Sequence, residues 1–168
     1  SFVAALGMAD AVATVLPRSA YVTCKWPNDV LVEGRKISGI LLESEAPALG
    51  GIEWLVVGAG LNIISHPDDT EYPATSLIAE GGVKVTQEQM LETFCLRFRA
   101  GMVTWKNLGF EPIRRAWVKR AHGLGKEITV RLERETLVGE FTRLDEDGAL
   151  ILLHNGAERR ITAGDVYF

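Results

Sequence analysis

The first apolar pattern of the chain has the spacing of a helix. Phe2, Leu6, Ala9, Ala13 and Leu16 recur every three or four residues, and the pattern stops at a proline. Residues with this spacing share one face of an α-helix, and proline cannot continue a helix. The sequence therefore predicts a helix at the start of the chain, with its apolar face packed on a sheet.

Short strands are expected after this helix. Three segments share a high content of apolar and β-branched residues, namely Tyr21–Trp26, Val30–Val32 and Lys36–Glu43. Pro27 lacks a backbone donor and favours an extended residue before it, so the first strand should end there. Gly34 suits a tight turn between the other two strands. The pattern predicts a meander that brings Lys36 close to the turn after Trp26.

A further strand and two loops are expected before the next helix. Ala46–Gly51 has the composition of a loop, Ile52–Val57 is apolar, and Gly58–Asn62 is expected to form a turn. The glycines in that turn resemble a dinucleotide-binding fingerprint, but Ile63 stands where the fingerprint needs a third glycine. This disfavours a Rossmann fold. The polar segment Ser65–Ala74 contains two prolines and is predicted to be a loop.

Helical spacing returns in the second half of the chain. Thr86 and Gln89 have the spacing of a capping box, so a helix should run from about Gln87 to Asn107. A second helix should begin near Pro112, since proline is well suited to a first turn. The residues expected to face the core from the longer helix are Met90, Leu91, Phe94, Phe98, Met102 and Trp105.

The pattern changes to strict alternation after Gly123 and Gly125. The alternating segments are residues 128–132, 138–144, 149–153 and 159–162, and tight-turn sequences separate several of them. Several short strands joined by tight turns predict a small barrel. We therefore expect two domains, residues 1–121 and 122–168.

Composition narrows the class of protein. Of 168 residues, 47% are hydrophobic and 24% charged, as in globular proteins, and the net charge of −4 argues against non-specific nucleic-acid binding as the main task.

Cys24 and Cys95 lie in apolar patterns and are expected to be buried thiols. The three histidines are isolated, so no protein metal cage is predicted. No apolar run approaches the roughly 20 residues of a membrane span and no signal peptide is visible, which favours the cytoplasm.

Three polar motifs lie within the core-forming segments. They are Lys25-Trp26-Pro27-Asn28-Asp29, then Gly34-Arg35-Lys36 with Gly39-Ile40-Leu41 and Glu43, and finally Gly58-Ala59-Gly60-Leu61-Asn62. Spacing alone would also permit a surface hairpin with solvated lysines. In this order, however, the motifs resemble the catalytic domain of biotin protein ligases. The resemblance runs from the first residue to the last.

The resemblance implies a fold and an activity. The implied fold class is α+β, with a mixed or antiparallel sheet packed with helices, similar to class II aminoacyl-tRNA synthetases, followed by an SH3-like barrel. The barrel patterns are Gly139-Glu140-Phe141, Asp147-Gly148-Ala149-Leu150 and Ala163-Gly164-Asp165-Val166. The implied activity converts biotin and ATP, with Mg²⁺, to biotinoyl-AMP. It then transfers biotin to a lysine of the biotin carboxyl carrier protein of acetyl-CoA carboxylase or a related carboxylase.

The resemblance also assigns roles to residues. Lys36 is the central catalytic cation, near the biotin carboxylate and the α-phosphate, and Lys25 is a second cation. A fixed cation acts where charge develops in the transition state. The residues expected to bind biotin or the nucleotide are Asn28, Asp29, Gly39, Ile40, Leu41, Gly58, Ala59, Gly60 and Asn62. Asp29 is expected mainly to anchor its turn. No Ser-His-Asp or Cys-His arrangement is apparent, which fits direct transfer from the adenylate.

One departure from the family pattern affects the expected activity. The family's G-R-G-R-x-G-R loop, which closes over biotin and the phosphates, does not occur in this chain. Since the chain also begins within a helical pattern, we expect it to be part of a longer polypeptide. Alone it should show little ligase activity, and biotinylation of an acceptor domain by the 168 residues would overturn this. We also expect uncovered apolar sheet surface and association between copies, such as a homodimer.

Other functions remain open from the sequence. A lipoate or octanoyl ligase or transferase shares the catalytic fold, although such proteins generally lack the C-terminal barrel pattern. A biotin-responsive repressor would require a DNA-binding domain before Ser1, since DNA binding by this chain itself is not expected. A binding module built from the barrel alone is disfavoured by the three motifs.

Overall fold

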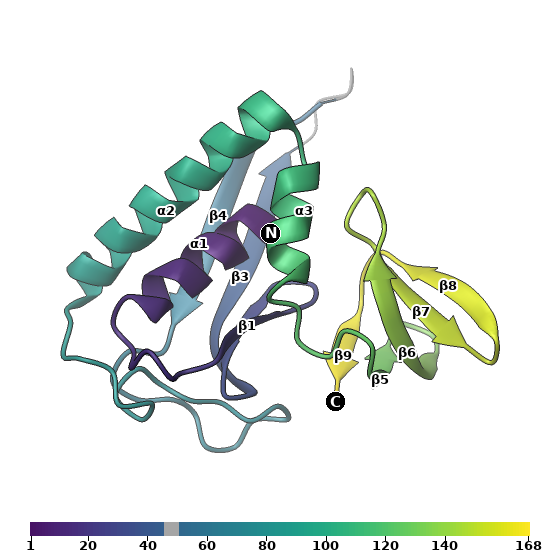
Figure 1. Ribbon diagram of the computed structural model, residues 1–168, viewed down its shortest axis with the longest axis horizontal. Helices are drawn as coiled ribbons and strands as arrows, with labels where there is room; N and C mark the ends of the chain where they lie inside the picture. Colours follow the sequence, from purple (N-terminus) through teal and green to yellow (C-terminus); the bar gives the residue numbers. More distant parts are fainter. Residues whose placement is uncertain (46–50) are drawn as a thin grey trace.

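The chain folds into two modules, each built on an antiparallel sheet. The computed structural model describes residues 1–45 and 51–168. The elements of this part are, in order, α1 (Phe2–Ala13), β1 (Val22–Lys25), β2 (Asp29–Val32), β3 (Arg35–Glu45), β4 (Trp54–Leu61), α2 (Gln87–Leu108), α3 (Glu111–Val118), β5 (Glu127–Arg131), β6 (Thr136–Leu144), β7 (Leu150–His154), β8 (Ala157–Ile161) and β9 (Asp165–Tyr167). Figure 1 shows the helices packed on the first sheet and the second sheet beside them. The predicted α+β class is confirmed. Apart from Gly51, the loop expected at Ala46–Gly51 lies outside the described residues.

Helix α1 is the central element of the first module. Eight of its 12 residues are buried, and it packs on one face of the sheet with α2 beside it (Figure 1). The close approach of the two helices requires Gly7, because a Cβ there would lie 3.0 Å from the backbone nitrogen of Phe98. The predicted helix is confirmed, although it ends at Ala13, and Leu16 remains buried beyond its end.

The first sheet is a meander in the order β1-β2-β3-β4, so the predicted three-strand meander is confirmed and β4 extends it. Glu33 and Gly34 join β2 to β3 with φ angles of 49° and 75°. Positive φ at both central residues is the geometry of a type I′ turn, which matches the twist of the strands it connects. The strand through Lys25 ends immediately before Trp26-Pro27, as expected from the missing donor of proline.

Strand β4 differs from the prediction. Gly58, Ala59 and Gly60 are not in a turn, because all three lie within β4 and pair with β3. Leu41 is opposite Gly58 and Gly39 is opposite Gly60. Glycine is uncommon inside strands, so the sequence favoured a turn here. Pairing with the long strand β3 nevertheless keeps all three residues in the sheet.

The predicted capping box of α2 is confirmed. The Thr86 hydroxyl accepts a hydrogen bond from the Gln89 amide at 3.2 Å, and the Gln89 side chain accepts one from the Thr86 amide at 2.9 Å. The burial pattern differs from the prediction, since only Met90 and Phe94 are buried while Leu91, Met102 and Trp105 are exposed. The prediction of a buried thiol holds for Cys24 and is wrong for Cys95, which is exposed on α2.

The second module is a five-stranded antiparallel sheet in the order β8-β7-β6-β5-β9. The predicted strands are present, and Asp165–Tyr167 adds a short strand that was not predicted. β5 pairs with β9, and no β8–β9 pairing closes the sheet within the described residues. The pairings of the described residues form a five-stranded sheet with a register shift in β6 between Phe141 and Arg143, and closure into the expected small barrel is not seen in them.

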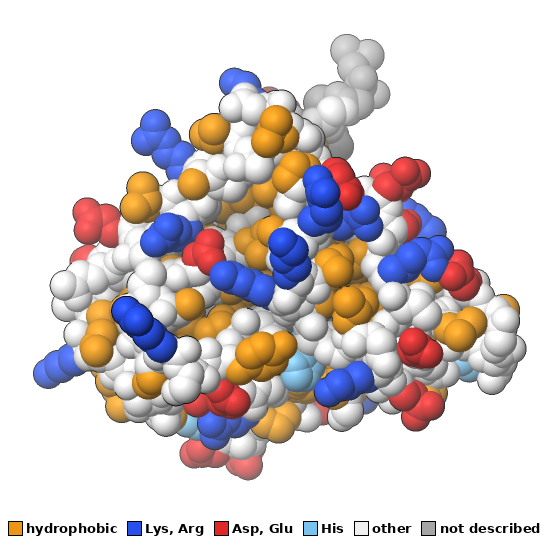
Figure 2. Space-filling view, in the orientation of Figure 1, with side chains coloured by type: hydrophobic (Ala, Val, Ile, Leu, Met, Phe, Trp, Pro, Cys, Tyr) orange, Lys and Arg blue, Asp and Glu red, His pale blue; other side chains and the backbone are white. Residues whose placement is uncertain are grey.

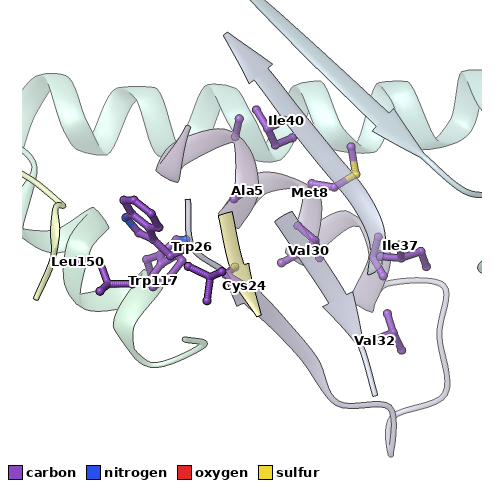
Figure 3. Packing of buried hydrophobic residues seen from close by; sticks show 14 of the residues in the cluster. Ala5, Met8, Cys24, Trp26, Val30, Val32, Ile37, Ile40, Trp117 and Leu150 are labelled. Carbon is purple, nitrogen blue, oxygen red and sulfur yellow. The ribbon is translucent and has the colours of Figure 1, made fainter. Parts of the chain in front are cut away.

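A shared apolar core joins the two modules. Figure 3 shows Trp26 of the first module and Leu150 of the second on either side of Trp117 from α3. The indole of Trp26 donates a hydrogen bond to the Gly148 carbonyl at 3.1 Å. The segment that connects the modules is also hydrogen-bonded to β1. The Cys24 amide donates to the Arg120 carbonyl, and the His122 amide donates to the Cys24 carbonyl. The C-terminal module is therefore held against the strand that carries Lys25.

The surface over the helices carries charges of both signs. In the view of Figure 2, Lys and Arg side chains alternate with Asp, Glu and apolar patches. None of the helices in the described part of the chain has the length and apolar character needed to cross a membrane.

Candidate active site

The polar turn after β1 brings two lysines to one aspartate. Asp29 begins β2 and pairs with Lys25 across the first hairpin, and on its other side it pairs with Gly39 of β3. Asp29 Oδ2 lies 3.1 Å from Lys25 Nζ, and Asp29 Oδ1 lies 2.7 Å from Lys36 Nζ. One carboxylate therefore holds both cations that the sequence had singled out.

The two lysines differ in exposure. The side chains of Lys25 and Asp29 are 8% and 7% exposed, whereas that of Lys36 is 41% exposed. Lys25 Nζ also donates to the Val166 carbonyl at 3.2 Å and lies 4.8 Å from the centre of the Tyr72 ring. Lys25 is thus enclosed by three partners, while the ammonium of Lys36 can reach a ligand.

An irregularity in β3 sets the direction of Lys36. Leu31 pairs with Lys36 and Val30 pairs with Ser38, so β3 has one residue more than β2 at this point. Such a bulge changes which face of the sheet a side chain occupies. As a result Lys36 lies on the same face as Gly39, although an odd number of positions separates them.

Gly39 provides the space for the lysine head group. A Cβ at this position would lie 3.3 Å from both Cε and Nζ of Lys36 and 3.4 Å from Asp29 Oδ1. These separations are tight for carbon contacts, so a larger residue would push the ammonium aside. The absence of a side chain at Gly39 is therefore part of the site geometry.

The sheet beside Lys36 presents an open apolar strip. Gly58 and Gly60 lie opposite Leu41 and Gly39, and Leu41 is 63% exposed. A Cβ at Gly60 would meet only the Gly39 carbonyl, at 3.9 Å. Because side chains in a strand alternate between faces, these four residues share one face. The strip allows a flat ligand to approach the backbone closely.

Two residues expected at this strip have their side chains elsewhere. Ile40 is buried in the core, and both of its backbone groups bond to Asn28. Ala59 lies on the opposite face, where it lines a cavity of about 350 Å³ with Met8 and Phe94. The structure therefore brings Gly39, Leu41, Gly58 and Gly60 together but not the side chains of Ile40 and Ala59.

The two asparagines hold the backbone around the lysines. Asn28 Nδ2 donates to the Ile40 carbonyl at 2.7 Å, and Asn62 Nδ2 donates to the Thr75 carbonyl at 2.9 Å. One donor of each side-chain amide is thus used within the protein. The side-chain carbonyl oxygen of each asparagine is an acceptor that could face a ligand.

Sequence reasoning missed the groups that enclose Lys25. Tyr72 lies 47 positions away in a loop, and burial together with the nearby Asp29 charge raises the pKa of Tyr72 to about 12, so its phenol stays neutral. Val166 contributes only a carbonyl, which no side-chain pattern can reveal. The one available signal was the lone aromatic residue in an otherwise polar loop.

The described residues contain no cluster of three or more His, Cys, Asp or Glu side chains that could hold a metal ion. Both oxygens of Asp29 are already used by lysines. A metal at this site would therefore have to bring most of its own ligands.

Comparison with known proteins decides the family. The profile of the biotin/lipoate A/B protein ligase family matches residues 1–119, and that of the biotin protein ligase C-terminal domain matches residues 123–168. The chain belongs to the biotin/lipoate A/B protein ligase family. Among similar sequences, this family member is 37% identical over 173 residues to a biotin–[acetyl-CoA-carboxylase] ligase of Paracoccus denitrificans, covering 100% of this chain and 72% of that protein.

Other similar proteins share less of their sequence with this chain. The bifunctional ligase/repressor BirA of Bacillus subtilis is 30% identical, and the match covers 84% of this chain and 45% of BirA. The fold is shared with the apo structure of biotin protein ligase from Aquifex aeolicus, with a TM-score of 0.82 at 22% identity. That match covers 99% of this chain and 73% of the Aquifex chain. The chain thus spans less than half of BirA and about three quarters of the Aquifex enzyme.

Proposed function

We propose that the protein is a biotin protein ligase that forms biotinoyl-AMP and transfers biotin to a lysine of a carrier protein. The observation that carries the proposal is the exposed side chain of Lys36. Asp29 holds it at the edge of the open apolar strip, which from here on is called the glycine strip. Sequence similarity to a biotin–[acetyl-CoA-carboxylase] ligase supports biotin as the substrate. The proposal places the reaction in the cytoplasm.

Lys36 is proposed to promote the first half-reaction. A biotin carboxylate oxygen forms a bond to the α-phosphorus of ATP, and the bond to pyrophosphate breaks, with the electron pair leaving on pyrophosphate. Negative charge develops on the phosphate oxygens between two reacting anions. A cation already in place stabilises this charge without reorganising. Lys25, which is enclosed, holds Asp29 and through it the position of Lys36.

The glycine strip is proposed to receive the biotin ring. Gly58 and Gly60 leave backbone exposed beside Gly39 and Leu41, so the ring system can lie flat on the sheet with its carboxylate toward Lys36. In the second half-reaction the carrier lysine amine attacks the acyl carbon and AMP leaves. No nucleophile of the protein is needed for this step.

ATP is proposed to bind with Mg²⁺ as part of the substrate. Mg²⁺ usually keeps several waters and takes few protein ligands. The side-chain oxygens of Asn28 and Asn62 fit this limited role, since their amide nitrogens bond to the protein. Asp29 fits the role of an anchor, because its oxygens hold the two lysines.

The acceptor is proposed to be the biotin carboxyl carrier protein of acetyl-CoA carboxylase or a related carboxylase, and the enzyme is proposed to associate with a second copy.

The test of the proposed function incubates the full-length protein with ATP, Mg²⁺, the carrier domain and equal amounts of biotin, lipoate and octanoate. Mass spectrometry should find the biotin adduct alone, and the Lys36→Ala variant should form it much more slowly than the wild type. A lipoyl or octanoyl adduct as the main product would overturn the proposal in favour of the lipoate branch of the family.

A further inference from the structure

The loop between β4 and α2 pairs with the backbone of Lys36. The Lys36 amide donates to the Pro73 carbonyl at 2.7 Å, and the Lys36 carbonyl accepts from the Thr75 amide at 2.9 Å. These two bonds form a short parallel bridge between Lys36 and Ala74. The position of the catalytic lysine therefore depends on where this loop lies.

The same loop is bound to the C-terminal module two residues earlier. Glu71 accepts a hydrogen bond from an Arg131 guanidinium nitrogen at 2.6 Å and another from the Tyr167 hydroxyl at 3.0 Å. The hydrogen bond from Arg131 lowers the pKa of Glu71, so the carboxylate stays ionised at neutral pH. Glu71 therefore links the loop to β5 through Arg131 and to β9 through Tyr167.

Tyr72 continues this connection toward the other lysine. Its ring meets that of Phe168 edge to face, with centroids 6.4 Å apart, and its face lies 4.8 Å from Lys25 Nζ. From Glu71 to Thr75 the loop thus contacts the C-terminal module on one side and both lysines on the other.

We propose that Glu71 is a positioning residue through which the C-terminal module holds the loop, and with it Lys36, in the geometry of the reaction. The inference rests on the proposed function, in that Lys36 serves adenylate formation. The Glu71–Arg131 ion pair is exposed, and exposed pairs add little to global stability. A loop with few buried contacts can nevertheless open locally, so losing the pair should affect this loop before the whole fold.

The test compares Glu71→Ala with Glu135→Ala in the full-length protein. Glu135 forms a similar exposed pair with Arg159, at 2.7 Å, and both partners of this pair belong to the C-terminal module. We expect Glu71→Ala to speed hydrogen exchange of the Lys36 and Thr75 amides about two- to fivefold and to slow biotinoyl-AMP formation by a similar factor. Glu135→Ala should change neither, and exchanging the charges in Glu71→Arg with Arg131→Glu should restore both.

The outcomes separate the two claims. Unchanged exchange at Lys36 and Thr75 in Glu71→Ala would overturn the positioning role, whatever the activity. The same would follow if Glu135→Ala matched Glu71→Ala, or if the exchanged pair restored nothing. A wild-type protein that forms no biotinoyl-AMP would overturn the proposed function instead, and the exchange rates would still decide whether Glu71 positions the loop.

Discussion

Asp29 determines what each neighbouring lysine can do. Its two oxygens hold Lys25 on the enclosed side and Lys36 on the open side, leaving one excess positive charge at the mouth of the site. An exposed lysine is a mobile point charge that can meet a phosphate, while an enclosed one mainly fixes its partners. This division of roles leads to different expectations for the two lysines.

Removing either lysine should give a distinct result. Lys36→Ala should slow biotinoyl-AMP formation about 10²- to 10³-fold, because a preorganised charge is lost, with little change in stability. Lys25→Ala should slow it less but lower the free energy of unfolding by about 3 kcal/mol, because Asp29 loses its buried partner and keeps only Lys36. Pyrophosphate exchange and urea unfolding measure the two effects, with the exposed Lys84→Ala as control. Equal losses of activity in both variants would contradict this ranking.

Gly39→Ala tests the space beside the lysine. The added methyl would lie 3.3 Å from Lys36 Nζ, so it should displace the ammonium and lower the rate of adenylate formation about tenfold or more. Gly60→Ala would place its methyl 3.9 Å from the nearest atom, so it should raise the KM for biotin without lowering this rate at saturation. Steady-state kinetics of the two variants distinguish these effects. The same pattern in both would show that Gly39 has no special relation to Lys36.

The sequence predicts this site in part. Lys25, Asp29 and Lys36 are found together because they lie on adjacent strands of a short meander, and such local pairing follows from turn chemistry. Tyr72 and Val166 could not be predicted, because their approach to Lys25 depends on how a long loop and a separate module dock. The bulge that turns Lys36 toward Gly39 also leaves no mark in the hydrophobic pattern.

The N-terminus of α2 depends on its capping box. Thr86→Ala should lower the free energy of unfolding by about 1 kcal/mol, because the Gln89 amide loses its acceptor. Thr104→Ala, within the same helix, should leave stability equal or slightly higher, since alanine has the better helix propensity. Chemical unfolding followed by circular dichroism measures both. A Thr86→Ala protein as stable as wild type would show that the cap contributes nothing here.

The elements themselves follow the sequence closely, and the differences have physical causes. Helical and strand periodicity located α1, α2 and most of the strands, because most of these elements bury one face. Leu91 and Trp105 were expected in the core, but periodicity identifies an apolar face and does not tell whether anything covers it. β9 was missed because three residues are too few to show an alternation.

His122 links the stability of the whole molecule to pH at the junction of the two modules. Its ring meets that of Phe168 edge to face, with centroids 4.5 Å apart, and burial lowers its pKa from 6.5, with Lys126 and Lys25 adding to the effect. The folded protein thus favours neutral His122. Its contribution to stability is present above pH 6.5 and lost as the pH falls through the lowered pKa.

His122→Gln should therefore show a flatter loss of stability than wild type between about pH 7.5 and about pH 5. The unfolding midpoint in urea, measured across this range, gives the comparison. His154→Gln, on β7 of the second module, is the matched control. A wild-type profile that coincides with that of His122→Gln would mean that this histidine does not couple protonation to the junction.

The central claim is that Lys36 belongs to a site for biotinoyl-AMP, and calorimetric binding of a non-hydrolysable biotinoyl-AMP analogue tests it most directly. We predict saturable binding to the wild-type protein and to Lys84→Ala, and binding weaker by about tenfold or more to Lys36→Ala, because the charge that faces the phosphate is lost. Equal affinity of the wild type and Lys36→Ala for the analogue would contradict the account.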